Sequence, residues 1–473
     1  MRTTISGCLF ISLLSAGGAW GQAFSPGGVD PVTGQAYKAP ADLQGRGLDF
    51  HADLQTVGIY RNDSDFSREE PFYDHGQSRG GVATILTPRL WLHLSDDIFI
   101  YYEAELGLNY WSRNNPDGED PTARDIFILK HREVFAEGQV LDRRLHFKVG
   151  YQRLLDTTGL FINHWLGAAQ LYYNFGDAGR VGVFFAQVPD NTYEGITLRD
   201  NNFDADTFLF GARADLRLSQ ELRLSLALHD LWDKHVVGKR LYVIAPNFRL
   251  VGQFGFVTAW IDGVFQYGER EASAVDSSGK PTDQTLLAWA WQAHAAFQLS
   301  PITLTFNVFA LSPDDKDPGN TRDGAFLYSA KNQSATVMLT EDEVRDVYDN
   351  LDERLAVKGS EAGVPRFPFY QLRPGLLVGD ARITYEVARF FRPALTIGAA
   401  TVLKSENALG NRYLGTEIGL DLEFTALEKH LIAHLAPGVL VPGKAASLFN
   451  QIDVGAEADR PMWWVVASLM LRY

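Results

Sequence analysis

After its first 21 residues the sequence lacks any run of about 18 apolar residues, the length that a membrane-spanning helix needs. It has a single cysteine, Cys8, and so offers no disulfide framework. Metal-site patterns are missing as well, because there is no HExxH and no paired-cysteine set. A basic surface is not expected either, since the formal net charge of −15 argues against nucleic-acid binding. Helical membrane spans and disulfide scaffolds are therefore excluded, and no metal or cofactor is predicted.

The first residues instead resemble an export signal. Arg2 supplies a positive charge, an apolar core follows at 8–15, and Ala19-Trp20-Gly21 forms a small-x-small cleavage site. The apolar core is too short to span a bilayer. An ordinary N-terminal core helix is the alternative, but the Gly17-Gly18 pair would break it. We expect residues 1–21 to be a signal peptide, which removes Cys8 from the mature chain.

Most of the remaining sequence alternates with a period of two. In 99–111, one face carries Ile100, Tyr102, Ala104, Leu106, Leu108 and Tyr110, and the other carries Phe99, Tyr101, Glu103, Glu105, Gly107 and Asn109. The pattern returns in 208–218, 222–229, 287–299, 302–310, 395–403 and 414–424. If one face of each strand meets lipid and the other meets water, carboxylates can alternate with apolar residues along the strand. The same arrangement explains the polar mean hydropathy of −0.13.

Short turns and longer polar loops alternate between these segments, which gives about 18 strands. The last segment, 463–473, has an apolar face that ends in Tyr473 and resembles the C-terminal assembly signal of outer-membrane proteins. The sequence thus predicts an all-β fold, a transmembrane antiparallel up-and-down β-barrel over 47–473 in a Gram-negative outer membrane. Residues 22–46 would be a periplasmic tail. The expected partners are outer-membrane lipid and the barrel assembly machinery.

The connection 311–366 is too long for a passive hairpin loop. Thr340 to Glu343 reads as a capping box, and apolar residues at helical spacing follow it, which predicts a short helix over 341–355. This extracellular helix would fold over or into the pore mouth. The alternative is a helix that lies flat on neighbouring loops.

Charged residues on the strand faces opposite the apolar stripes are the candidate pore lining. Their role would be ionic selectivity and weak binding of a polar solute, and the alternative is that they pair with one another and fill a wet interior. The set is Lys148, Arg213, Asp215, Arg217, Arg223, Arg373, Arg382, Glu103, Glu105, Glu417 and Asp421. No catalytic residue is predicted, because the scattered histidines His164, His229, His294 and His434 form no motif.

Several segments resemble the alginate export family of outer-membrane barrels. They are 411–422 (NRYLGTEIGLDL), Val441-Pro442-Gly443, 132–137 (REVFAE) and 145–152 (LHFKVGYQ), although Tyr151 stands where the family has arginine. The resemblance implies a monomeric 18-stranded barrel that lets a secreted polysaccharide cross the outer membrane, with a periplasmic export-scaffold protein as a partner. The mixed charge of the expected lumen departs from the family's anionic-polymer exporters and favours a neutral or differently charged polymer. The gate would come from 311–366 or 22–46, because the turn Leu427–His430 is short.

Three hypotheses follow. The first is an outer-membrane channel for secretion of an exopolysaccharide. The second is a general or substrate-selective diffusion porin for small solutes. The third is an outer-membrane enzyme.

Overall fold

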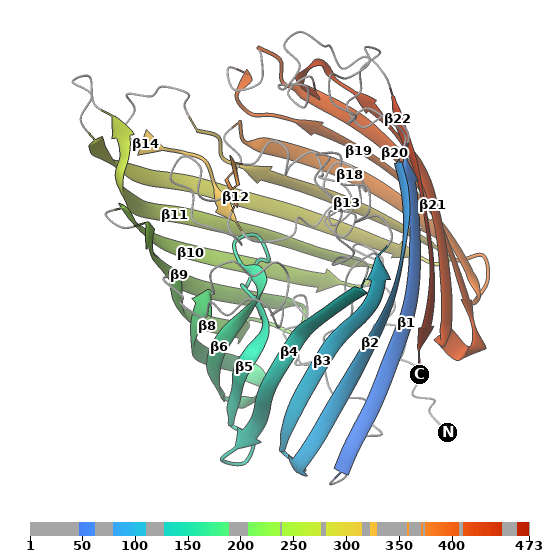
Figure 1. The fold of residues 1–473 in the computed structure, drawn as a ribbon, viewed down its shortest axis with the longest axis horizontal. Helices are drawn as coiled ribbons and strands as arrows, with labels where there is room; N and C mark the ends of the chain where they lie inside the picture. The colour runs from blue at the N-terminus through green and yellow to red at the C-terminus, as the bar shows by residue number, and fades with distance from the viewer. Residues whose placement is uncertain are drawn as a thin grey trace.

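The protein is a closed β-barrel, seen here in a computed structural model (Figure 1). It describes residues 47–61, 79–109, 127–188, 207–236, 239–275, 281–314, 322–328, 357–358, 370–371, 374–405, 410–446 and 461–472. Eighteen strands form the wall, each antiparallel to its neighbours, and β1 (Gly47–Arg61) closes it against β22 (Met462–Arg472). The predicted fold class is confirmed.

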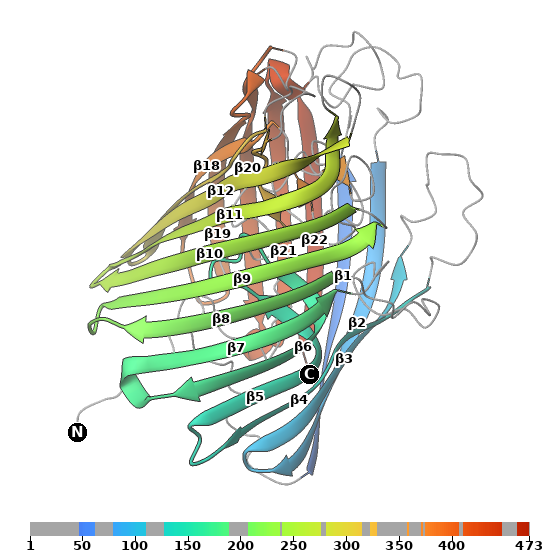
Figure 2. The same ribbon diagram turned by 90° about the vertical axis from the view of Figure 1, so that its left-hand side faces the viewer.

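The other wall strands follow one another in chain order. Before the long connection they are β2 (Arg79–Ser95), β3 (Ile98–Asn109), β4 (Phe127–Val140), β5 (Leu145–Leu155), β6 (Asn163–Asn174), β7 (Gly179–Val188), β8 (Thr207–Arg217), β9 (Leu222–Val236), β10 (Lys239–Phe254), β11 (Val257–Val275), β12 (Pro281–Leu299) and β13 (Ile302–Leu311). After it come β18 (Leu376–Tyr385), β19 (Phe391–Thr401), β20 (Tyr413–Ala426) and β21 (Leu431–Pro442). Figure 2 shows them inclined around the wall.

Alternating exposure along each strand separates an outward face from an inward face. On β3, Ile100 is 39% exposed while its neighbour Tyr101 is fully buried, and on β22 Trp463 is 43% exposed while Trp464 is 1% exposed. The exposed residues are large and apolar on strand after strand, as a lipid-facing surface requires. This agrees with the faces predicted for 99–109 and for the last strand, and it sets the barrel in an outer membrane.

Connections are short at one end of the barrel. They include the turns at 141–144, 255–256 and 300–301 and the 3-10 turns η5 (Gly176–Ala178) and η7 (Leu427–Lys429). Two of the longer polar loops that the sequence predicts, 231–239 and 269–283, are wrong in their bounds, because the strands β9 to β12 extend into both ranges. In these segments outward and inward residues still alternate, because Trp232 is 44% exposed beside the buried Asp233 and Glu269 is exposed beside the buried Arg270, so they continue the pleat. No described helix is long and apolar enough to cross a membrane.

Two connections turn inward instead of standing above the rim. Residues 156–162 carry Leu160, Phe161 and Ile162, each at most 1% exposed. Within the long connection, β14 (Arg322–Asp323) pairs in parallel with β12, and Phe326 and Leu327 are fully buried. A small sheet joins β15 (Leu327–Tyr328), β16 (Val357–Lys358) and β17 (Tyr370–Gln371). The predicted helix at 341–355, the signal peptide and the tail 22–46 lie outside the described residues.

Candidate lumen site

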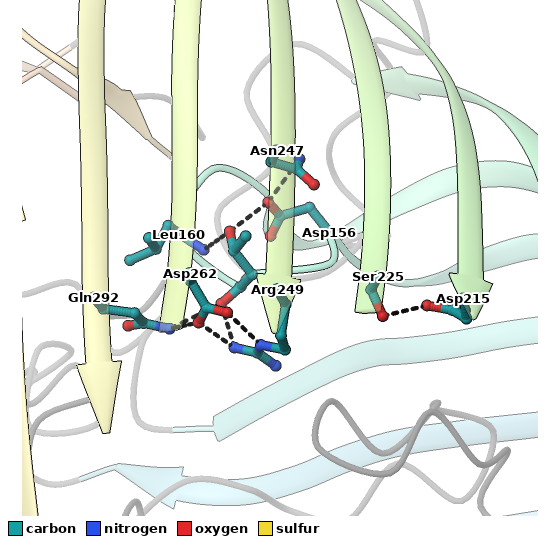
Figure 3. A network of polar contacts seen from close by, with 9 residues as sticks. Asp156, Leu160, Asp215, Ser225, Asn247, Arg249, Asp262 and Gln292 are labelled. Atoms are coloured by element: carbon teal, nitrogen blue, oxygen red, sulfur yellow. Dashed lines mark hydrogen bonds and ion pairs between the residues drawn. The ribbon is translucent and has the colours of Figure 1, made fainter. Parts of the chain in front are cut away.

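A buried ion pair on the inward face lies at the centre of the candidate site (Figure 3). Arg249 of β10 and Asp262 of β11 are direct cross-strand partners. Nε and Nη2 of Arg249 each donate to one oxygen of the Asp262 carboxylate at 2.7 Å. Gln292, the Asp262 neighbour on β12, donates to the same carboxylate. The side chains of the ion pair are 1% and 0% exposed, so the pair belongs to the interior of the barrel.

This ion pair fastens the inward loop to the wall. Arg249 Nη2 donates to the carbonyl oxygen of Thr158 at 2.8 Å, and Gln292 Nε2 donates to the same oxygen at 3.1 Å. The donors lie 91 and 134 positions along the chain from Thr158. Two wall strands, β10 and β12, therefore position a loop that leaves the wall between β5 and β6.

The loop is also closed on itself. Asp156 N donates to Ile162 O at 2.9 Å, Thr158 Oγ1 donates to Asp156 Oδ2 at 2.8 Å, and Leu160 N donates to Thr158 Oγ1 at 3.0 Å. Gly159 has a φ of 67°, a left-handed conformation that favours glycine. Burial raises the pKa of Asp156 above the usual range of an aspartate, although the bond from Thr158 opposes the shift.

Asn247 and His229 contact the loop from the wall. Asn247 Nδ2 donates to Asp156 Oδ2 at 3.4 Å and to His229 Nδ1 at 2.8 Å. His229 is 1% exposed, and its ring meets Phe161 of the loop at 5.8 Å between centroids. His229, one of the four scattered histidines of the sequence, thus packs against the loop, which is a structural position.

A second inward segment is held by side chains of β11. Arg270 Nη1 donates to Asp323 Oδ2 at 2.7 Å. Gln266 binds the backbone of Leu327 twice, because its Nε2 donates to the carbonyl oxygen at 2.6 Å and its Oε1 accepts from the amide at 2.9 Å. The start of the long connection is therefore fixed inside the mouth of the barrel.

The structure brings several predicted lumen residues together in ion pairs. Arg213 Nε lies 2.9 Å from Asp215 Oδ1, and Arg180 Nε lies 2.7 Å from Asp215 Oδ2. Ser225 also donates to Asp215 at 2.6 Å. On the other side of the barrel, Arg382 Nη2 lies 2.7 Å from Asp421 Oδ2. The inward face is thus largely charge-paired where these residues meet.

Glu103 and Glu105 lie in a further charged group on β3. Arg89 of β2 donates to Glu103 at 2.9 Å and to Asp53 of β1 at 2.6 Å. Glu105 Oε1 lies 2.7 Å from Arg132 Nε.

The remaining predicted residues are spread over the barrel. Lys148 Nζ lies 3.8 Å from the Phe135 ring centroid, and Glu417 is 1% exposed on β20. Arg217 and Arg223 face each other across β8 and β9 near the short-turn end. Arg373 lies outside the described residues.

The residues that hold the loop were not among the predicted pore-lining set. Arg249 lies on a strand whose inward face carries several buried apolar residues, such as Val243, Ala245 and Val251 on β10. A lone arginine within such a stripe is the signal that could have marked the site. Asp156 lies in a connection that the sequence predicts as one of the longer polar loops, and nothing in the nearby sequence shows that this loop turns inward.

Comparison with solved structures gives the same architecture. OccK9 (OpdG) of Pseudomonas aeruginosa matches with a TM-score of 0.54 at 10% identity, covering 90% of this chain and 98% of that chain. OccAB2 of Acinetobacter baumannii matches with 0.53 at 10% identity, covering 90% and 98%. A BenF-like porin from Pseudomonas fluorescens Pf-5 matches with 0.52 at 11% identity, covering 90% and 99%. The chain has the fold of an outer-membrane porin.

The porin fold revises the resemblance seen in the sequence. The similar structures are porins of the Occ/OprD type, so the alginate export family is supported only at the level of an outer-membrane barrel of the porin class. The short motifs that carried the resemblance lie mostly in strands, where alternation and turn glycines recur for reasons of barrel geometry. No protein-family pattern and no curated protein matches the sequence.

The described residues offer no sign of a metal centre. Among them, no three His, Cys, Asp or Glu side chains gather into a set that could hold a metal ion. The site is instead a polar inner wall to which two inward segments, 156–162 and 322–328, are attached by hydrogen bonds. Such an arrangement can narrow a conduit and present fixed charges to a solute.

Proposed function

We propose that the protein is a passive diffusion channel for small polar solutes, with the loop 156–162 narrowing its lumen. The observation that carries the proposal is the attachment of Thr158 to Arg249 and Gln292 inside the barrel wall. A loop bound by two buried donors is a fixed obstacle, because releasing it would leave Arg249 and Gln292 without the carbonyl acceptor of Thr158. The likeness of the fold to porins supports the same function.

Export of an exopolysaccharide, the first hypothesis from the sequence, is the weaker candidate. A polymer needs a continuous wide path, whereas 156–162 and 322–328 are both held inside the barrel. The third hypothesis, an outer-membrane enzyme, has no support in the site, where the buried polar groups serve as loop contacts.

Flux through the folded protein in liposomes tests the proposal. We expect swelling in arabinose, slower swelling in larger sugars, and a steady ionic current in planar bilayers that a neutral polysaccharide leaves unchanged. Absence of both flux and current in protein with native gel mobility would contradict the channel. Block of the current by the polysaccharide would restore the export hypothesis.

A loop-replacement variant tests the role of 156–162. Exchanging these residues for Asn-Gly, a two-residue turn suited to joining antiparallel strands, removes the obstacle and keeps β5 and β6 paired. We expect the barrel to fold and its conductance to increase. The matched control exchanges only Thr157→Ala, because neither Arg249 nor Gln292 binds residue 157. Equal conductance in all three proteins would remove the loop from the permeation path.

A further inference from the structure

Asp230 of β9 is a carboxylate on the outward face of the wall. Its strand alternates strictly, because the even-numbered Leu228 and Trp232 are 50% and 44% exposed, whereas the odd-numbered His229 and Leu231 are 1% and 0% exposed. Side chains two positions apart on a strand point the same way, so Asp230 shares the outward face with Leu228 and Trp232. The strands β8 to β11 around it lie side by side in the part of the wall nearest the viewer in Figure 2.

Apolar outward residues flank this carboxylate on both neighbouring strands. Its direct cross-strand partners are Phe210 of β8, which is 45% exposed, and Ile244 of β10. A charged group on the lipid-facing side of a barrel costs free energy, and charged groups within a membrane usually serve a function. From the described residues the Asp230 carboxylate accepts one hydrogen bond, which Trp232 Nε1 donates to Oδ1 at 2.9 Å. The indole is neutral, so this bond leaves the negative charge uncompensated.

Aromatic rings lie beside the carboxylate on the side of the longer loops. Trp232 is the direct partner of Tyr242 on β10, and their ring centroids are 5.7 Å apart with the ring planes at 84°. Tyr267 of β11, the cross-strand partner of Ile244, is 61% exposed on the same outward face. Rings at right angles beside a carboxylate suit an organic ammonium group, which gains both cation–π attraction and an ion pair.

A second carboxylate lies on the far side of these rings. Glu269 of β11 is exposed and is the direct partner of Tyr242. Two strand spacings, roughly 10 Å, separate β9 from β11. Within the described chain no three His, Cys, Asp or Glu side chains form a metal-binding set, so the arrangement fits an organic cation better than a metal ion. We call the group the outer patch, and its members are Asp230, Trp232, Tyr242, Tyr267 and Glu269.

The outer patch lies where the apolar belt ends. One step further towards the longer loops the outward residues are polar, because Arg240 of β10 is exposed and its backbone amide donates to the Glu271 carboxylate at 3.3 Å. One step towards the short turns they are apolar, as Leu228 shows. Trp and Tyr favour this boundary between hydrocarbon and headgroups. The molecules that meet the outer patch in a membrane are therefore lipids, at the level of their headgroups.

We propose that the outer patch binds the ammonium group of a membrane lipid, for which phosphatidylethanolamine is the representative. The ammonium lies against the rings of Trp232 and Tyr242 and pairs with the Asp230 carboxylate. The acyl chains of the same lipid follow the apolar belt past Leu228 and Phe210. An anionic lipid without an ammonium group is repelled by the two carboxylates. The inference goes beyond the proposed channel, because the patch lies on the opposite side of the wall from the lumen.

Native mass spectrometry of the detergent-solubilised protein, with equal amounts of phosphatidylethanolamine and phosphatidylglycerol, measures the preference. We expect the wild type to retain phosphatidylethanolamine over phosphatidylglycerol by about threefold to tenfold, the effect of a cation–π contact at a partly exposed site. D230N should lower this ratio by about threefold or more, and Y242L should lower it although both carboxylates remain. D142N is the matched control, because it removes an exposed carboxylate at the short-turn end and changes the net charge equally.

Three results would overturn the inference. A preference that needs Mg²⁺ and disappears in EDTA would assign the patch to a metal-bridged phosphate. Dimers that are lost in D230N would assign it to a second copy of the chain. Equal ratios in the wild type and D230N, the result if Lys234 neutralises the carboxylate, would leave the patch without a lipid ligand.

Conductance separates this inference from the proposed function. D230N and Y242L with native gel mobility should carry the same ionic current as the wild type, because both substitutions lie outside the lumen. A wild type without current that still prefers phosphatidylethanolamine would refute the channel and support the lipid site.

Discussion

The contribution of an ion pair to the stability of this protein depends on how deeply the pair is buried. Arg249 and Asp262 are at most 1% exposed and form two parallel hydrogen bonds, whereas Arg143 and Asp97 at the rim are 68% and 41% exposed. Both pairs have the same chemistry and similar distances, 2.7 and 2.8 Å. An exposed pair contributes about 0–1 kcal/mol, while removal of one partner from a buried pair leaves an uncompensated charge.

The first prediction concerns the buried pair. Arg249→Met should lower the free energy of unfolding by about 3–5 kcal/mol, because it leaves the buried Asp262 carboxylate without its cationic partner. Arg249→Met combined with Asp262→Leu should recover much of that stability, yet leave Thr158 with Gln292 as its wall donor. Urea unfolding in detergent micelles measures the stability. Current noise in planar bilayers measures how often the loop 156–162 moves from its attached position. Arg143→Gln is the control, and a single variant no less stable than this control would contradict the argument.

At the scale of elements, the inward loop depends on the protonation of one buried side chain. Asp156 closes the loop with Thr158 and contacts Asn247 on the wall. Burial raises its pKa, so the neutral form is favoured when the loop is seated relative to when it is released. The group therefore favours the seated loop at low pH, and this contribution is lost as the pH rises through the raised pKa.

Acidification should therefore stabilise the narrowed state. We expect the mean conductance to fall as the pH is lowered below neutrality towards the usual range of aspartate, with fewer excursions to larger currents. Asp156→Asn keeps the size of the side chain and removes its titration, so this part of the pH dependence should vanish. A wild-type conductance that rises on acidification, or an identical pH profile in Asp156→Asn, would contradict the prediction.

The strands could be predicted from the sequence, and the inward loop could not. Alternation in 99–109 or 463–471 is a local property that fixes which side chains share a face. The position of Thr158 depends on Arg249 and Gln292, which lie 91 and 134 positions away along the chain. Only closure of the barrel brings them close to it. For the same reason the sequence placed Arg213, Asp215, Arg382 and Asp421 on inward faces but did not identify Arg180 as the further partner of Asp215.

For the molecule as a whole, the decisive contact is between the first and the last strand of the wall. β1 and β22 pair in register from Asp53 with Arg472 to Arg61 with Trp464. Without that pairing the wall would be an open sheet whose two edge strands carry unsatisfied backbone groups, which lipid cannot hydrogen bond. The barrel is therefore closed only when the last strand, β22, has paired with the first, β1.

Engineered cysteines test this closure. Val57 and Ser468 are direct partners across the seam and lie on the inward face, so V57C/S468C should form a disulfide on mild oxidation. A shift in gel mobility after denaturation, reversed by reductant, measures it. V57C/T396C is the control, because Thr396 belongs to β19 and pairs with β18 and β20. Absence of the cross-link in V57C/S468C, or its appearance in the control, would contradict the closed order of strands.

The bond to Thr158 is made through its carbonyl oxygen, not through its side chain. Residues of β10 and β12 therefore determine where the loop is attached. The side chains of the loop itself determine the surface that a passing molecule meets. Selection can alter one without disturbing the other. Substitutions at loop positions outside Asp156, Thr158, Gly159 and Phe161, which hold the loop in shape, would change what the channel admits while the barrel stays intact.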